Sequence, residues 1–251
     1  MKRKFIYLIL PALIICIGIY NLFSSNNISS AFSDTQNKLP LNEMYFNKWK
    51  GKSWITLGDS ITKANGYQHK LKDILGFSKI DNIGENGHTM AYQPKNKSTY
   101  TVGNLVNYKE YDLATIFIGT NDFRYNKKLG KIKESGSGGF DKTTFTGAYQ
   151  LLIETILSSN PYIDLVLITP PQRIHDGYDI SFTNEAGSKL IDYVSVIKTL
   201  GEMYSLPVLD LYSEGGITKE NMNTFTRDGL HPNEVGYERI SEKMYRFLLD
   251  I

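Results

Sequence analysis

Cysteine is almost absent from this chain, because its 251 residues include only one, Cys16. A single cysteine cannot form a disulfide within the chain, so an ordinary apolar core must stabilise the fold. The net charge of +2 argues against a nucleic-acid partner, since such proteins concentrate Lys and Arg. Neither the four histidines nor the acidic residues show metal-ligand spacing, and we expect no metal and no cofactor.

Long apolar runs are scarce as well, and one uncharged run, residues 5–23, lies directly after Lys2, Arg3 and Lys4. At about 1.5 Å per helical residue it spans about 28 Å, close to the hydrocarbon thickness of a bilayer. Basic residues before the run favour a cytoplasmic N-terminus and an extracytoplasmic location for the residues after the run. We therefore predict that residues 1–24 are a membrane anchor. The alternative is a signal cleaved near residues 29–31, which would release a secreted protein.

The remainder of the chain reads as a linker followed by one domain. Residues 25–48 are rich in Ser and Asn and show little apolar periodicity, which is typical of a tether. Residues 49–251 contain short apolar runs in alternation with segments of helical spacing, without an internal repeat. With 41% hydrophobic and 22% charged residues the composition is ordinary for a globular protein, so composition selects no function.

Strand-length apolar runs rich in β-branched residues predict strands at 54–57, 80–83, 113–118, 165–168 and 207–211. Helical periodicity predicts helices at 68–75, 144–158, 186–204 and 235–249. In the last of these, Val235, Ile240, Met244, Phe247 and Leu248 fall largely on one side. Strands that alternate with helices pair in parallel, so we predict an α/β fold, a three-layer α/β/α sandwich with a mostly parallel five-stranded sheet, as in flavodoxin-like proteins.

Chemically capable residues follow two of these strands. Ser60 comes after the first strand and Asn121 after the third, so both are expected at the carboxyl edge of the sheet, where such folds bind ligands. A serine hydroxyl needs a base to become a nucleophile, and His231 is the best base among the histidines. Asp228, three residues earlier, is able to fold back and hold the other ring nitrogen of His231. Taken alone, Ser60 could equally be a helix cap.

Four sequence blocks support the catalytic interpretation. They are Gly58-Asp59-Ser60-Ile61-Thr62, Asn82-Ile83-Gly84-Glu85-Asn86-Gly87, Gly119-Thr120-Asn121-Asp122 and Asp228-Gly229-Leu230-His231-Pro232. In these blocks and in their order the chain resembles the SGNH, or GDSL-type, serine hydrolase superfamily. The resemblance implies a Ser60, His231 and Asp228 triad that forms an acyl-enzyme.

The same resemblance assigns an oxyanion hole to the backbone N–H groups of Ser60 and Gly87 and the side-chain amide of Asn121. Three neighbours of these groups are predicted to line the pocket: His88, Thr120 and Phe123. Asp59 and Asp122 are expected to brace their turns through backbone hydrogen bonds. Residues 123–142 form a basic, glycine-containing connection, which is either a flap over the site that attracts an anionic polymer or a solvated loop.

These features predict an extracytoplasmic serine esterase. Its expected substrate is an acyl ester, chiefly an acetyl ester on cell-surface or extracellular carbohydrate, and its expected further contact is the membrane through the N-terminal helix. Three alternatives stay open at this stage: a lysophospholipase or lipase, an O-acyltransferase, and a non-catalytic glycan-binding module. Beyond this class of substrate, the sequence does not identify the individual acyl group, the individual acceptor or the oligomeric state.

Overall fold

A five-stranded sheet organises the computed structural model, which describes residues 47–95 and 97–251. The strands are β1 (Ser53–Gly58), β2 (Lys79–Asn82), β3 (Leu113–Phe117), β4 (Asp164–Ile168) and β5 (Val208–Leu209). Their order is β2-β1-β3-β4-β5, and every neighbouring pair is parallel. The parallel pairing places the carboxyl ends of all strands at one edge of the sheet.

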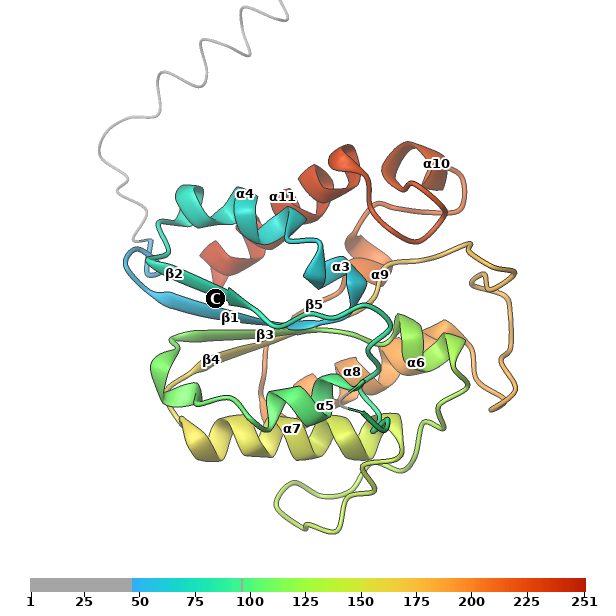
Figure 1. Ribbon diagram of the computed structural model, residues 1–251, viewed down its shortest axis with the longest axis horizontal. Helices are drawn as coiled ribbons and strands as arrows, with labels where there is room; N and C mark the ends of the chain where they lie inside the picture. The colour runs from blue at the N-terminus through green and yellow to red at the C-terminus, as the bar shows by residue number, and fades with distance from the viewer. Residues whose placement is uncertain (1–46, 96) are drawn as a thin grey trace, which may run out of the picture. The chain divides into compact units, whose positions relative to one another are not determined.

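Helices cover both faces of this sheet (Figure 1). On one face lie α4 (Gly66–Leu75) and α11 (Glu234–Asp250), and on the other α5 (Thr99–Gly103), α7 (Phe145–Ser159) and α8 (Leu190–Tyr204). Shorter helices occupy the connections: α3 (Ser60–Lys63), a 3-10 turn (Tyr108–Glu110), α6 (Thr120–Arg124), α9 (Leu211–Glu214) and α10 (Met222–Phe225). The arrangement confirms the predicted three-layer α/β/α sandwich.

Side-chain alternation along the strands explains why both faces are covered. In β1, Ile55 and Leu57 belong to the apolar cluster on the α7 and α8 side, whereas Trp54 belongs to the cluster under α4 and α11. Because successive side chains of a strand point to opposite faces, a strand that is apolar on both needs helices on both. Each fully buried apolar side chain of this size stabilises the fold by roughly 1.5–3 kcal/mol.

Two of the differences between the predicted and the observed boundaries have a local cause. Helix α8 starts at Leu190 rather than at residue 186, because Gly187 has a φ of +79° and the Ser188 N–H donates to Oδ1 of Asn184 at 2.9 Å. Strand β5 has only two residues, because Asp210 already caps α9 by accepting a bond from the Ser213 N–H.

Helix α11 differs in one detail from the apolar side that the sequence predicts. Ile240, Met244 and Leu248 are each 1% exposed, as the periodicity indicates, but Val235 in the first turn is 46% exposed. Phe247 is half-buried at the edge of the cluster. The helix therefore packs along a narrower stripe than predicted.

The predicted membrane anchor, residues 1–24, lies outside the described residues. The predicted linker, residues 25–48, also lies outside them apart from its last two positions, Asn47 and Lys48. Residues Asn47–Ile251 form one compact unit. Between residues 47 and 251, with Asn96 left aside, none of the helices has the length and apolarity that a bilayer span requires.

Candidate active site

The serine turn follows β1 directly. Asp59 caps α3, because its Oδ1 accepts a hydrogen bond from the Ile61 N–H at 2.9 Å, and Ser60 is the first residue of that helix. A Cβ atom at Gly58 would lie 2.2 Å from the Thr62 hydroxyl oxygen, so only glycine fits this position. The turn thus presents Ser60 at the carboxyl end of β1, where the sequence predicted it.

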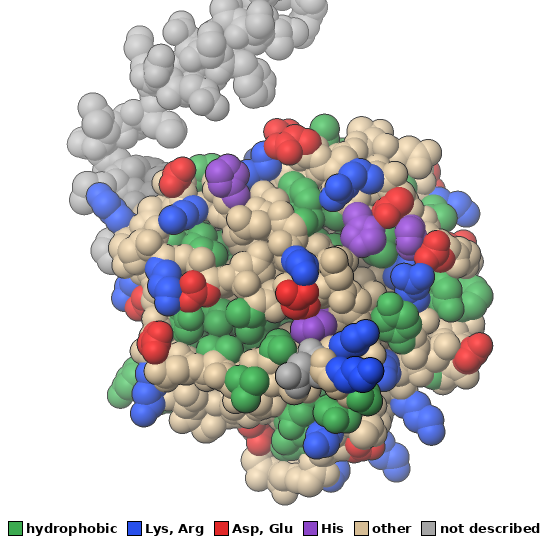
Figure 2. Space-filling view, viewed as in Figure 1, with side chains coloured by type: hydrophobic (Ala, Val, Ile, Leu, Met, Phe, Trp, Pro, Cys, Tyr) green, Lys and Arg blue, Asp and Glu red, His purple; other side chains and the backbone are tan. Residues whose placement is uncertain are grey.

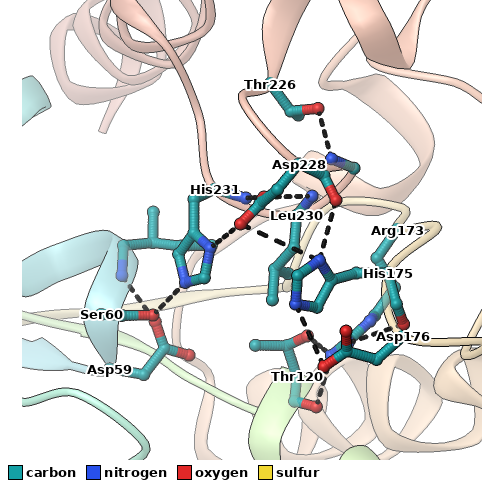
Figure 3. A network of polar contacts seen from close by, with 12 residues as sticks. Asp59, Ser60, Thr120, Arg173, His175, Asp176, Thr226, Asp228, Leu230 and His231 are labelled. Carbon is teal, nitrogen blue, oxygen red and sulfur yellow. Dashed lines mark hydrogen bonds and ion pairs between the residues drawn. The ribbon is translucent and has the colours of Figure 1, made fainter.

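Ser60, His231 and Asp228 form a continuous chain of contacts (Figure 3). Oγ of Ser60 lies 3.0 Å from Nε2 of His231, and Nδ1 of His231 lies 2.7 Å from Oδ2 of Asp228. Oδ1 of Asp228 accepts bonds from the backbone N–H groups of His231 at 2.8 Å and Leu230 at 3.1 Å. The carboxylate therefore binds its own turn through one oxygen and the imidazole through the other.

The electrostatics of Asp228 keep it ionised. Burial alone would raise the pKa of this carboxyl, but the hydrogen bonds from the side chain and backbone of His231, its charge and the Leu230 N–H lower the pKa to about 2. An ionised Asp228 accepts from Nδ1–H of His231, and this tautomer leaves Nε2 free to accept the proton of Ser60.

The site lies at the surface. The side chains of His231 and Asp228 are 32% and 37% exposed. Figure 2 shows histidine side chains beside acidic ones on the right of the face that it displays. A substrate in solution can therefore approach the base and the serine without a large opening of the fold.

The second and third sequence blocks meet next to this chain of contacts. Nδ2 of Asn121 donates to the backbone carbonyl of His88 at 2.9 Å, one residue after Gly87, whose φ is +73°. The Glu85 N–H donates to the carbonyl of Gly58 at 3.2 Å, which ties the Gly87 loop to the serine turn. The structure therefore brings together the segments that carry all the predicted oxyanion donors.

Asp59 and Asp122 are braces, as expected. The two carboxylate oxygens of Asp122 accept bonds from the N–H groups of Met90 at 2.7 Å and Ala91 at 2.9 Å. Burial raises the pKa of Asp59 and the pKa of Asp122 to about 7 each, against the opposing effect of these hydrogen bonds. Both residues hold loops in place and are buried, with Asp59 2% and Asp122 0% exposed.

The residues predicted to line the pocket are all buried. His88, Thr120 and Phe123 are 4%, 1% and 0% exposed. Phe123 packs edge-on against the rings of Tyr178 and Tyr193, with centroid distances of 5.6 Å and 6.2 Å. The hydroxyl of Thr120 accepts a hydrogen bond from the buried side chain of Arg173 at 2.8 Å. Contact between these side chains and a substrate stays a prediction.

Sequence reasoning missed Arg173 and placed His175 only in a polar loop. Arg173 is fully buried, donates through Nη1 to the Thr120 hydroxyl at 2.8 Å and to its carbonyl at 3.2 Å, and has a pKa lowered to about 10 by burial. Nδ1 of His175 lies 2.8 Å from the backbone oxygen of Asp228. Position in the fold could have indicated these two residues, because their segment follows β4 at the carboxyl edge of the sheet.

The central part of the basic connection 123–142 packs along α7. Gln150 of α7 accepts from the Lys133 N–H at 3.1 Å and donates to the Lys133 carbonyl at 2.8 Å. The Gly136 N–H donates to Glu154 of the same helix at 2.8 Å. These bonds favour the interpretation as a surface loop over that of a flap. In the described part of the chain, no three His, Cys, Asp or Glu side chains gather as metal ligands do.

Comparison with known proteins agrees with this geometry. Residues 56–239 match the sequence model of the GDSL-like Lipase/Acylhydrolase family. No curated protein sequence matches the chain.

Solved structures share the fold. A protein from Lactobacillus plantarum is 28% identical with a TM-score of 0.70, and the alignment covers 79% of this chain and 97% of that one. An acetyl xylan esterase is 26% identical with a TM-score of 0.56, over 77% and 98% of the two chains. A possible lipase from Chitinophaga pinensis, at 23% identity and a TM-score of 0.61 over 78% and 96%, shares the fold. The family match spans most of the chain, from β1 into α11, and includes all four sequence blocks. The chain therefore belongs to the GDSL-like Lipase/Acylhydrolase family and is an SGNH-type hydrolase that acts on esters.

Proposed function

We propose that this hydrolase is an extracytoplasmic serine esterase that removes acyl groups, chiefly acetyl, from cell-surface or extracellular carbohydrate. The observation that carries the catalytic part is the chain of contacts from Oγ of Ser60 through His231 to Asp228, at 3.0 Å and 2.7 Å. A nucleophile, a base and an orienting acid in hydrogen-bond reach are what acyl transfer to serine requires.

In the first step, Oγ of Ser60 attacks the ester carbonyl carbon while its proton moves to Nε2 of His231. Negative charge develops on the former carbonyl oxygen, and donors preset at that position are worth about 3–4 kcal/mol each by mutational precedent. The N–H of Ser60 is available for this purpose, because the first N–H groups of a helix have no intrahelical acceptor. The N–H of Gly87 and the amide of Asn121 are proposed to complete the oxyanion hole.

The intermediate collapses when the bond to the alcohol oxygen breaks and the imidazolium of His231 protonates that oxygen. A water molecule then attacks the acyl group on Ser60, with His231 again as the base, and the carboxylic acid leaves as the serine regains its proton. Asp228 stabilises the imidazolium in both halves of the reaction and keeps the ring in one orientation.

Two observations support an acetylated carbohydrate as the substrate. One is the 26% identity with a solved acetyl xylan esterase, an enzyme named for an acetylated polysaccharide. The other is the apolar run of residues 5–23 behind Lys2, Arg3 and Lys4, which favours export to the compartment where such glycans occur.

A substrate panel tests the proposal. The protein is incubated with acetylated glycans and with acyl esters of graded chain length, and the acid released is measured. We expect acetate release, a decline in rate with acyl length and no release by Ser60→Ala. A preference for long acyl chains would favour the lipase alternative, and transfer of acetyl to a second glycan without free acetate would favour an acyltransferase.

A further inference from the structure

The segment Arg173 to Asp176, which follows β4, contacts two separate parts of the candidate site. Nη1 of Arg173 donates to the hydroxyl and to the carbonyl oxygen of Thr120, the neighbour of Asn121. The next residue, Ile174, donates its N–H to the carbonyl of Gly229 at 2.8 Å, inside the turn that carries Asp228. The segment thus spans from the predicted oxyanion donor to the predicted acid.

His175 makes the side-chain contact to that turn (Figure 3). Its Nδ1 lies 2.8 Å from the backbone oxygen of Asp228. A carbonyl oxygen only accepts, so Nδ1 of His175 carries the hydrogen. Nε2 lies 3.2 Å from Oδ2 of Asp176, which in turn pairs with Arg124 at 2.6 Å. Nδ1 also lies 3.8 Å from Oδ2 of Asp228, and the ring centroid lies 5.9 Å from that of His231.

The peptide unit between Asp228 and Gly229 is bonded at its carbonyl by His175 and at its N–H by the Thr226 hydroxyl, which accepts at 3.0 Å. Gly229 has a φ of +81°, and a Cβ there would lie 1.7 Å from the carbonyl oxygen of Ile174, so the turn fits tightly on the segment. The carbonyl of Asp228 accepts from His175 and the carbonyl of Gly229 accepts from Ile174. Rotation of the Asp228–Gly229 peptide would break the His175 bond.

Fixing this peptide matters because the acid is exposed. The side chain of Asp228 is 37% exposed, so water competes for its carboxylate, and packing alone does not determine its orientation. A rotation at the backbone of Asp228 would change the angle at which Oδ2 meets Nδ1 of His231, now 2.7 Å away. Errors of this kind at a catalytic base reduce the rate far more than the affinity for substrate.

We propose that His175 is a positioning residue for Asp228. Its Nδ1–H holds the backbone carbonyl of Asp228, so that the carboxylate of Asp228 keeps the orientation in which it binds His231. This inference rests on the proposed catalytic roles of Ser60, His231 and Asp228. His175 lies beside Asp228 and edge-on to the ring of His231, and its proposed action on the reaction passes through Asp228.

The test compares two substitutions of His175, each of which keeps one nitrogen donor of the ring. The amide nitrogen in His175→Asn takes the place of Nδ1, and that in His175→Gln takes the place of Nε2. With a small acetyl ester, we expect kcat to fall roughly 10- to 100-fold in His175→Gln, with KM changed less than about twofold. In His175→Asn we expect kcat within about threefold of the unsubstituted protein. His69→Gln, on the exposed side of α4, is the matched control.

A spectroscopic readout separates positioning from a loss of stability. The Nδ1–H proton of His231 in its short bond to Asp228 is expected far downfield in the proton NMR spectrum. The signal should persist in His175→Asn and weaken or shift in His175→Gln, at temperatures well below the midpoint of unfolding of each variant. If His175→Gln does not fold, His175→Ala takes its place in the same two measurements.

Unchanged kcat and an unchanged proton signal in His175→Gln would overturn the inference, as would equal losses in both amide variants. Ser60→Ala is measured alongside. If Ser60→Ala hydrolyses the ester at the full rate, the proposed function fails. If Ser60→Ala is inactive and His175→Gln is fully active, only the positioning role fails.

Discussion

Ser60 and His231 are 171 residues apart in sequence, yet their side chains lie 3.0 Å apart. Each is presented by a short turn whose own aspartate accepts backbone hydrogen bonds, Asp59 in one case and Asp228 in the other. The two aspartates differ in environment. Burial raises the pKa of Asp59 to about 7, whereas the bonds and charge of His231 outweigh burial and lower the pKa of Asp228 to about 2. Only Asp228 is suited to stabilise an imidazolium at neutral pH.

Removing the amide of Asn121 tests the proposed oxyanion hole. We expect Asn121→Ala to lower kcat by roughly 10²–10³-fold with little change in KM, because a donor aimed at the developing charge acts mainly in the transition state. The measurement is steady-state hydrolysis of an acetyl ester. Asn104→Ala is a matched control, since exposed Asn104 also donates to a backbone carbonyl, that of Tyr100. Equal rates for Asn121→Ala and the control would contradict the assignment.

The buried carboxyl of Asp59 predicts a pH effect on stability. Its pKa of about 7 in the folded protein lies above the unfolded value, so the folded state holds the proton more tightly. Stability from this group is fully present below about pH 4 and is lost as pH rises through about 7. Asp59→Asn retains the oxygen that accepts from Ile61 and removes the ionisation. We expect the fall in the free energy of unfolding from about pH 5 to about pH 8 to shrink by roughly 1–3 kcal/mol.

Urea denaturation of both proteins at the two pH values measures this effect. An identical pH dependence in Asp59→Asn would show that another group is responsible. Asp122, whose pKa burial also raises to about 7, is unchanged in both proteins and keeps part of the dependence in each.

The site residues differ in how far the sequence predicts them. Ser60, Asn121, Asp228 and His231 stand in short motifs, so residue type and order were sufficient to nominate them. Arg173 was missed because its partner, Thr120, is 53 residues away and no local pattern marks a buried guanidinium. His175 was noticed but not linked to Asp228 for the same reason, since that contact also joins residues 53 positions apart.

At the level of elements, the turn of residues 228–231 rests on the segment after β4. Gly229 is the contact point, since a Cβ there would lie 1.7 Å from the Ile174 carbonyl oxygen. We expect Gly229→Ala to destabilise the turn by about 3 kcal/mol or more, the sum of a backbone strain of roughly 1–3 kcal/mol and a steric overlap. Esterase activity should fall with it.

Gly187→Ala is the matched control for this substitution. Gly187 has a φ of +79°, close to the +81° of Gly229, but no heavy atom lies within 4 Å of its added Cβ. It carries the backbone strain without the overlap, so thermal unfolding should show a clearly smaller loss of stability. Equal losses in the two variants would mean that the close contact with Ile174 is unimportant.

Element prediction succeeded where burial follows periodicity. The two-sided apolar strands β1, β3 and β4 and the long helices were recognisable because each buries a regular pattern of side chains. It failed where a single hydrogen bond decides the boundary, as at Asp210, which ends β5, and at Asn184, which delays α8. The short helices α3, α6, α9 and α10 have too few residues to show a period.

For the molecule as a whole, the sheet edge joins contributions from both halves of the chain. The N-terminal half carries Ser60, Gly87 and Asn121, and the C-terminal half carries Asp228 and His231. The parallel topology places the carboxyl ends of the strands from both halves at one edge of the sheet. Neither half of the chain holds a complete site by itself. Fold class was predictable from the alternation of strands and helices. Location relative to the membrane rests on residues 1–24, outside the described part of the chain.

A cysteine reporter tests the extracytoplasmic proposal on the full chain. Cys16 is the chain's own cysteine, and Tyr162 is 93% exposed. We expect a membrane-impermeant maleimide to label Tyr162→Cys in intact cells, with the unsubstituted protein as the control for Cys16. Labelling of Tyr162→Cys only after the cells are broken would contradict the proposed location.

The central claim is that His231 and Asp228 activate Ser60 as the nucleophile. The most direct measurement is the intact mass of the protein after reaction with a fluorophosphonate probe, followed by peptide mapping. The account predicts one adduct on Ser60, none on Ser60→Ala, and strongly slowed labelling of His231→Ala. Labelling of Ser60→Ala to the same extent, or hydrolysis of an acetyl ester by that variant at the full rate, would contradict it.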